Sequence, residues 1–248
     1  MTAPIDAEEM AIRRDLAACY RLAAHFGWDD LVATHISARL PGPGHSFLIN
    51  PFGLLFEEIT ASSLVKIDLD GNILAPTEHR INQAAFVIHS AVHQARPEAR
   101  CVIHLHTRDG VAVSATEDGI LPLNQTAMML ARHVVFHEYE GVAFDVEERE
   151  RLQADLGTAD FMVLRNHGTM TVGESIASAF YRMYALEWAC TVQVRTLSMG
   201  SRLHPAPEAA IAKVGVQFPP DAVEAFAATL AWPALVRKVQ RLYPDYAS

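Results

Sequence analysis

The apolar residues of this chain change repeatedly between two spacings, one typical of helices and one typical of strands. A spacing of three or four predicts helices over residues 7–26, 82–95, 175–199 and 232–242. Alternation in twos predicts strands over residues 35–40, 46–50, 64–68, 73–75, 101–106, 134–139 and 161–165. Several strands follow one another through short turns such as Asp70-Gly71-Asn72, which is typical of hairpins. We therefore expect an α/β fold in which helices flank a mixed or mostly antiparallel sheet, not a doubly wound parallel one.

Composition favours one folded domain. Half of the 248 residues are hydrophobic and 20% are charged, so the chain can bury a sizeable core. No internal repeat and no Gly/Ser-rich linker divides it. We expect a single domain over residues 1–248, with a core over about 6–200 and a helical tail over about 201–248.

Charge and cysteine usage narrow the choice of partners and compartment. The net charge of −9 argues against a nucleic acid or an anionic membrane as partner. The charged N-terminal segment is unlike a signal peptide, and no apolar run approaches the roughly 18 residues of a membrane helix. Cys19, Cys101 and Cys190 lie far apart and form no C-x-x-C motif. These features predict a cytoplasmic protein with reduced thiols.

Histidine supplies the most informative chemical pattern. His104 and His106 flank Leu105 in an expected strand, so both imidazoles should point to one face of the sheet while Leu105 points to the other. His167 lies in the turn Asn166-His167-Gly168, where glycine lets the backbone turn tightly. Three histidines without a fourth protein ligand would leave open positions on a divalent metal ion, which is the pattern of catalytic sites.

Spacing alone leaves other interpretations open. A single H-x-H motif, or a single loop histidine, more often has a packing, capping or surface role. His89 and His93 lie four residues apart on an expected helix, which is also a metal-binding spacing. The apolar residues around them favour buried core or interface histidines instead. From its residues alone, the chain is an α/β domain with a candidate metal site.

Several segments taken together resemble the class II aldolase/adducin family. They are HISARLPGPG, FLINPFGLLFEEITASSLVKID, RPEARCVIHLHT, FHEYEGVAFD, LRNHGTMTVGESIASAF and ACTVQVRTLSMG, and the match spans roughly residues 6–199. The resemblance implies a three-layer αβα fold with a central, mainly antiparallel sheet, usually assembled as a homotetramer. It also implies that His104, His106 and His167 are the three metal ligands. INQAAFVIHSAVH and NHGTMTVGES are most similar to the adducin-like bacterial branch of the family.

The chain departs from the family pattern where the aldolases hold phosphate and their acid/base glutamate. Counting back from His104 places Ala85 at the position of that glutamate, and alanine can neither move a proton nor bind a metal. Gln83 and Ala84 stand in place of the serine pair that helps to hold phosphate. His35 stands in place of an asparagine of the phosphate loop. The resemblance thus implies a metal centre without the usual base and with little of the phosphate site.

Other polar residues are candidates to replace the missing groups. Tyr139 and His35 are the candidate catalytic residues, with His137 and Glu138 as further replacement acids. A surface or packing role fits each of these four equally well. The residues expected to contact the substrate are Gly53, which matches the glycine of the phosphate loop, Gln83 and Asn166.

The chemistry expected of such a centre is cleavage of a carbon–carbon bond. A divalent ion, with zinc the first expectation and manganese, iron or cobalt as alternatives, would act as a Lewis acid on a small hydroxy-acid or hydroxy-carbonyl. Retro-aldol cleavage and decarboxylation both need this electron sink. Decarboxylation fits better without the glutamate, because the departing carbon dioxide carries no hydroxyl proton for a base to remove.

Two alternatives from other classes stay open. One is a non-haem iron oxygenase on the same three histidines, although such sites more often contain a carboxylate. The other is a non-catalytic oligomeric scaffold like the adducin head. Animal adducins extend into a long tail with a basic end, and the chain reaches Ser248 without one, which argues against that role. Inward-facing histidines without a metal would also be costly unless each found a hydrogen bond.

Overall fold

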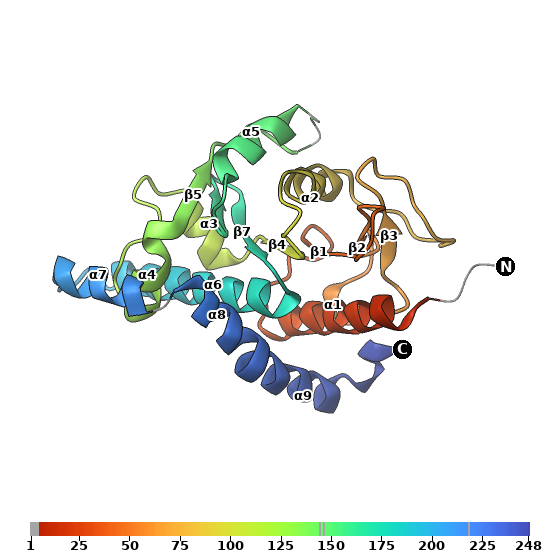
Figure 1. Cartoon of the computed structure of the whole chain (residues 1–248). Coiled ribbons are helices and arrows are strands. Elements are labelled where there is room, and N and C mark those ends of the chain that lie inside the picture. Colours follow the sequence, from red (N-terminus) through yellow and green to blue (C-terminus); the bar gives the residue numbers. More distant parts are fainter. Residues whose placement is uncertain (1–4, 144, 146, 218) are drawn as a thin grey trace.

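A single sheet forms the centre of the molecule, seen in a computed structural model that describes residues 5–143, 145, 147–217 and 219–248. Within these residues, seven strands lie in the order β3-β2-β1-β4-β7-β6-β5 (Figure 1). Their bounds are β1 His35–Arg39, β2 Phe47–Ile49, β3 Val65–Ile67, β4 Cys101–Leu105, β5 Val134–His137, β6 Phe161–Leu164 and β7 Gly168–Gly173.

Pairing in the sheet is antiparallel at every junction except one. β5 runs parallel to β6 at one edge, and the five other pairs are antiparallel. The expected mainly antiparallel sheet is therefore confirmed. The expected strand over residues 73–75 is wrong, because only Ile73 bridges to Ile67 of β3. Asp68 ends β3 there, since its side chain accepts bonds from the backbone N–H groups of Asp70 and Asn72.

The helices follow the sequence pattern closely. Asp6 caps α1 by accepting the N–H of Glu9 at 2.7 Å, and Asn82 caps α2 by accepting the N–H of Ala84 at 3.0 Å. The helices of the core are α1 Ala7–His25, α2 Gln83–Ala95, α3 Arg108–Ser114, α4 Gln125–Leu130, α5 Glu148–Leu156 and α6 Ile176–Ser198. The tail contains α7 Glu208–Gln217, α8 Pro220–Phe226 and α9 Trp232–Leu242.

Helix α2 and helix α5 cover one face of the sheet (Figure 1). Val87 and Ala91 of α2 and Leu152 of α5 form a buried cluster with Val102 of β4 and Met170 of β7. The cluster forms because these strand residues all point to the same side of the pleat.

Helices α1 and α6 cover the opposite face (Figure 1). Leu16 of α1 and Phe180 of α6 pack against Ile36 of β1 and against Ile103 and Leu105 of β4. Alternate residues of β4 thus belong to different layers, and the expected three-layer αβα architecture is confirmed.

The C-terminal tail docks onto the α1 layer. Trp232 and Val239 of α9, together with Tyr246, belong to the same buried cluster as Leu16. The indole N–H of Trp232 also donates to Asp15 of α1 at 3.3 Å. No helix in the described part of the chain is both long and apolar enough to cross a membrane.

Candidate metal centre

The three predicted ligand histidines meet where β4 ends and β7 begins. His104 lies on the α2 side of β4, whereas Leu105 is buried among α1 and α6 residues on the other side. His106 follows directly after the strand. β7 pairs antiparallel with β4, with Thr169 opposite Leu105, so the turn before β7 brings His167 beside both histidines. The order of the elements therefore assembles a site from residues 63 positions apart.

The imidazoles of these residues present their Nε2 atoms to one another. The Nε2 of His104 lies 3.0 Å from that of His106 and 3.3 Å from that of His167. Two nitrogens bound at 2.1 Å to one tetrahedral ion would lie about 3.4 Å apart. One ligand atom from each histidine lies within 4.8 Å of the others, which fits a divalent ion. These three histidines thus have the donor atoms and the spacing of a catalytic metal site.

The second ring nitrogen of His104 and that of His106 are held by the protein. His104 Nδ1 lies 3.1 Å from the carbonyl oxygen of Thr169, and His106 Nδ1 lies 3.1 Å from a carboxylate oxygen of Asp30. Because a carbonyl or carboxylate oxygen can only accept, each Nδ1 carries the hydrogen. The lone pairs are therefore on the Nε2 atoms, which is the tautomer that binds metal.

Burial keeps two of the ligands, His104 and His167, in their neutral form. The pKa of His104 is lowered well below its usual value, first by burial and then by the neighbouring imidazoles of His167 and His106. Burial, followed by the charges of His106 and His137, lowers the pKa of His167 to about 4. A cation therefore does not have to displace a proton from either imidazole at neutral pH.

The Asn166-His167-Gly168 turn has the geometry expected of it. Asn166 adopts a φ of 54°, in the left-handed region. A Cβ on Gly168 would lie 2.4 Å from the carbonyl oxygen of Leu105 and 3.1 Å from the ring of His106. Glycine is required at this position because the turn lies directly against the segment that carries the other two ligands.

A cavity of about 660 Å³ opens beside the ligands. His106 and His167 lie in its wall with three further predicted residues, Tyr139, His35 and Gln83. The remaining wall consists of Val32, Ala33, Phe52, Arg80, Ile81, Asn82, Ala84, Ile88, Gly141, Val142 and Ala143. The sequence pattern did not predict that Arg80 lies at the site, since this residue belongs to an irregular segment without a motif. No carboxylate lines the cavity within the described residues.

The candidate catalytic residues differ in their setting. Tyr139 is 53% exposed, and its ring centroid lies 6.4 Å from that of His167. His35 is buried, and its Nδ1 is 2.8 Å from the Nε2 of His89, which leaves its own Nε2 for the cavity. His137 does not line the cavity and is buried between Glu148 at 3.4 Å and Asp155 at 2.7 Å.

Two residues predicted to contact the substrate lie outside the cavity wall. Gly53 adopts a φ of 107° next to Phe52, which does line the cavity. Asn166 lines a separate hollow together with Glu138 and Arg165. On this placement, Asn166 shapes the turn that carries His167, and a direct contact with substrate stays a prediction for both residues.

The position of Ala85 corrects the sequence interpretation. Ala85 belongs to a buried apolar cluster with Phe47, Ile49, Val65 and Phe86, and it is not in the cavity wall. The preceding residue of α2, Ala84, lines the cavity instead. Ala85 therefore does not face the cavity, although its place in the family pattern suggested it, because the helix turns about 100° per residue and directs neighbouring side chains to different sides.

His89 and His93 are core histidines, as their apolar neighbours indicated. The hydroxyl of Ser37 lies 2.5 Å from His89 Nδ1 and 2.7 Å from His93 Nε2. Together with His35 they form a buried chain of hydrogen-bonded groups that begins at the cavity and runs under α2. These contacts give two histidines of α2 a packing role and not a second metal site.

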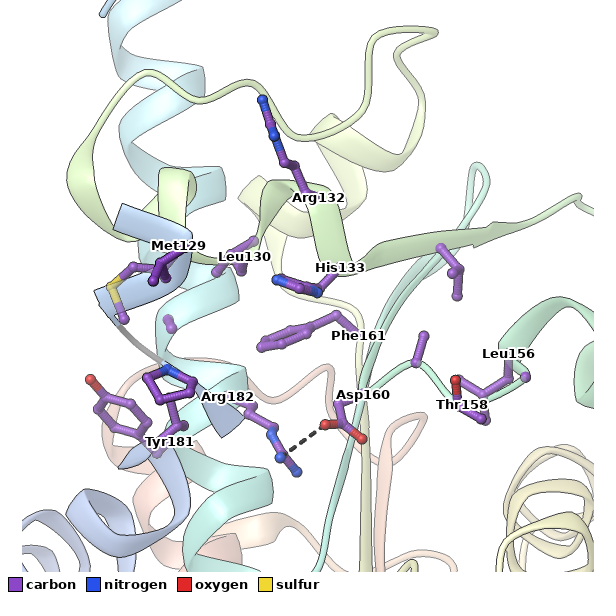
Figure 2. A pocket seen from close by; sticks show the side chains of 18 of the residues that line it. Met129, Leu130, Arg132, His133, Leu156, Thr158, Asp160, Phe161, Tyr181 and Arg182 are labelled. Atoms are coloured by element: carbon purple, nitrogen blue, oxygen red, sulfur yellow. Dashed lines mark ion pairs between the residues drawn. The ribbon is translucent and has the colours of Figure 1, made fainter. Parts of the chain in front are cut away.

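A larger cavity of about 790 Å³ lies near the start of β6 (Figure 2). His167 follows the other end of that strand. Its wall is mainly apolar, with Met129, Leu130 and Phe161 on one side. Asp160 and Arg182 in its wall form an ion pair at 2.9 Å. The three ligand histidines lie elsewhere, so the smaller cavity is the candidate site.

Comparisons with known proteins agree with this geometry. The profile of the Class II Aldolase and Adducin N-terminal domain matches residues 14–194, which include all three histidines. A Caulobacter vibrioides protein named "Putative aldolase class 2 protein" is 51% identical over 96% of this chain and 93% of its own length. Alpha-adducin of Rattus norvegicus is 47% identical over 78% of this chain but only 26% of its own length. The structure of an L-fuculose 1-phosphate aldolase from Glaciozyma antarctica PI12 matches with a TM-score of 0.83 and 27% identity, over 99% of this chain and 96% of that one.

Proposed function

The chain belongs to the class II aldolase and adducin family, and from this premise we propose that it is a divalent-metal-dependent lyase. It cleaves a carbon–carbon bond of a small hydroxy-acid or hydroxy-carbonyl substrate. The observation that carries the proposal is the convergence of three Nε2 atoms, from His104, His106 and His167, at the edge of one cavity. A divalent ion on these imidazoles would act as a Lewis acid, stabilising the negative charge left on the substrate when the bond breaks.

The residues of the chain supply the proton transfers. Decarboxylation needs one proton, delivered to the carbon that loses carbon dioxide. Tyr139 lines the cavity, and its hydroxyl would donate this proton. Retro-aldol cleavage also needs a base for the substrate hydroxyl proton, and His35 is the buried group in the wall that can accept it. Without a carboxylate in the described wall, decarboxylation makes the smaller demand on these residues.

Arg80 narrows the substrate class to an acid. It is the one guanidinium in the described wall of the cavity, and its group lies 5.5 Å from the ring of Phe52. A guanidinium binds a carboxylate through paired hydrogen bonds. The fuculose phosphate aldolase is named for a phosphorylated substrate. Gln83 and Ala84 offer this chain no hydroxyl pair for phosphate, so an unphosphorylated hydroxy-acid fits better.

Three further features belong to the same proposal. Zinc is the first choice of ion because three imidazoles suit it, with manganese, iron and cobalt as alternatives. The protein works as a homotetramer in the cytoplasm, with a small molecule as its ligand.

A non-haem iron oxygenase is less well supported, since the common iron site includes a carboxylate that the described wall lacks.

The proposal is tested by metal analysis followed by a substrate screen. Protein purified without chelator is expected to carry one divalent ion per chain, and His104→Ala or His167→Ala should remove it. His204→Ala is the matched control, because His204 is an exposed residue of the tail. The loaded protein is then screened with hydroxy-acids and aldols for release of carbon dioxide or an aldehyde. Absence of bound metal from the unsubstituted protein, even after incubation with zinc or manganese, would contradict the proposal.

A non-catalytic scaffold is the second candidate, supported by the identity to alpha-adducin. Such a protein would keep the fold and its assembly while losing turnover. The same screen distinguishes the two candidates. A scaffold would show no cleavage of any acid or aldol, whether or not it binds a metal ion. Its His167→Ala variant would assemble as the unsubstituted protein does.

A further inference from the structure

Glu187 of α6 lies buried behind the candidate metal centre, with 3% of its surface exposed. One carboxylate oxygen accepts the hydroxyl of Thr107 at 2.5 Å, and the other accepts the hydroxyl of Thr169 at 3.0 Å. Each oxygen thus bonds to a different segment of the chain.

Both threonines are joined to the metal ligands. Thr107 follows His106 directly and caps α3 by accepting the N–H of Gly110 at 3.1 Å. Thr169 lies two residues after His167, and its carbonyl oxygen accepts the Nδ1–H of His104. Through these two residues, one carboxyl group contacts each of the segments that carry the ligands.

Glu187 and its two hydroxyl donors pack closely against Gly110 of α3. A Cβ on Gly110 would lie 2.5 Å from the Thr107 hydroxyl, 2.9 Å from a Glu187 oxygen and 3.0 Å from the Thr169 methyl. Any side chain larger than glycine at position 110 would push these groups apart. The local sequence therefore preserves space for the carboxyl group and its two hydroxyl donors.

Among the residues that the structure describes, no cationic side chain forms an ion pair with Glu187. Within the described residues, the hydrogen-bond partners of its carboxyl group are the two hydroxyls. Asp109 of α3 adds a second negative charge nearby. Cys190 of α6 is a further titratable group close to it, while the cap of α3 and strand β7 present the hydroxyls of Thr107 and Thr169. Burial raises the pKa of Glu187 to about 7, although the hydrogen bonds from the two hydroxyls lower it.

We propose that Glu187 is a positioning residue of the metal centre, which ties the two ligand-bearing segments together and whose negative charge is balanced by the bound divalent ion. The inference rests on the proposed metal site. A cation at the histidines favours the ionised carboxylate, so metal binding releases a proton from Glu187 wherever it is protonated in the metal-free protein. The group is mostly protonated at pH 6 and mostly ionised at pH 8, so metal affinity should rise with pH across this window.

The test compares the affinity for Co²⁺ of the unsubstituted chain and of Glu187→Gln by competition with a chelator at pH 6, 7 and 8. Glutamine keeps the shape and one acceptor but removes the charge. Removal of such a supporting partner typically weakens metal binding by about 10- to 100-fold. We expect about 10-fold weaker binding at pH 8, a shallower rise in affinity from pH 6 to 8, and an unchanged or higher melting temperature of the metal-free protein.

Controls separate this idea from a purely structural role and from failure of the metal site. Glu9→Gln removes another buried carboxylate, one paired with Arg13 and Lys66 far from the histidines, and should leave Co²⁺ affinity unchanged. If Glu187→Gln does not fold, Thr169→Val should weaken binding and Thr169→Ser should restore it. Equal affinity and equal pH slope in Glu187→Gln, or a lower melting temperature with unchanged affinity, would overturn the inference. Absence of Co²⁺ binding by the unsubstituted chain would instead overturn the metal site itself.

Discussion

Arg80 is the charged side chain of the cavity wall that can select an acid substrate. Arg80→Gln should raise KM for a hydroxy-acid by about 10- to 100-fold, because a charged hydrogen bond contributes about 1.5–3 kcal/mol. The kcat value should change less, since the group binds substrate before and after bond cleavage. Steady-state kinetics with the best acid of the screen measures both, and Arg80→Lys should recover part of the loss. An unchanged KM would show that the substrate carboxylate is bound elsewhere.

Neighbouring alanines of α2 make a matched pair for placing a new carboxylate. Ala85→Glu buries a charge among Phe47, Ile49 and Val65, so it should destabilise the fold by about 3–5 kcal/mol without a gain in metal binding. Ala84→Glu points into the cavity, where solvent and a cation can both stabilise the carboxylate, and should keep the stability while raising zinc affinity. Thermal melts and chelator competition, run side by side, check the pair. The opposite outcome, tighter binding in Ala85→Glu alone, would show that position 85 faces the metal.

Helix α2 joins to β1 through buried neutral histidines, and this junction should make the fold sensitive to acid. Burial lowers the pKa of His93 to about 3 and that of His89 well below its usual value. The unfolded chain takes up these protons near pH 6.5, but the folded chain does not. The contribution of these histidines to stability should therefore be constant above pH 6.5 and fall below it, by about 1.4 kcal/mol per pH unit for each histidine. Urea unfolding of the metal-free protein at pH 7 and pH 5.5 measures the slope, and His93→Gln should reduce it by about one proton; an equal slope in the variant would contradict the assignment.

Elements with a strong local signal could be predicted from the sequence. Asp6 and Asn82 cap α1 and α2 where the pattern indicated, and the H-x-H strand and the N-H-G turn carry the converging histidines. The local sequence pattern does not predict structure that depends on pairing or packing between segments far apart in the chain. The residues after Asn72 alternate like a strand but bridge β3 at one residue only.

The supporting groups of the site lie beyond any such pattern. Arg80, Asp30 and Glu187 reach the centre from an irregular segment, a loop and a long helix. None has a spacing relation to His104, so only the folded chain brings them together. Their types were visible in the sequence, but their contacts depend on how three layers pack.

An aromatic surface on the α6 layer bears on how whole molecules associate. Tyr184 and Trp188 stack with ring centroids 6.3 Å apart, and Trp188 remains 51% exposed. Phe26 and Trp28, which are half-buried against the core, border the same surface, since Phe26 contacts Tyr184. Tyr181 of the same helix lies apart from this surface and packs against Phe226 of the tail. Clustered exposed aromatics of this kind mark protein interfaces more often than free surface.

We predict that this surface is a subunit contact of a homotetramer. The loop after Trp28 carries Asp30, which holds His106, so association there would also steady the metal centre. Trp188→Glu places a charge in the contact and should shift the protein from tetramer towards monomer at micromolar concentration, with weaker metal binding as a consequence. Light scattering coupled to size-exclusion chromatography measures the mass, and Leu242→Glu, at another exposed apolar position, is the control. A monomeric unsubstituted protein would refute the assembly. A tetramer that Trp188→Glu leaves intact would keep the assembly but move its contact to another face, and the link between association and Asp30 would then be lost.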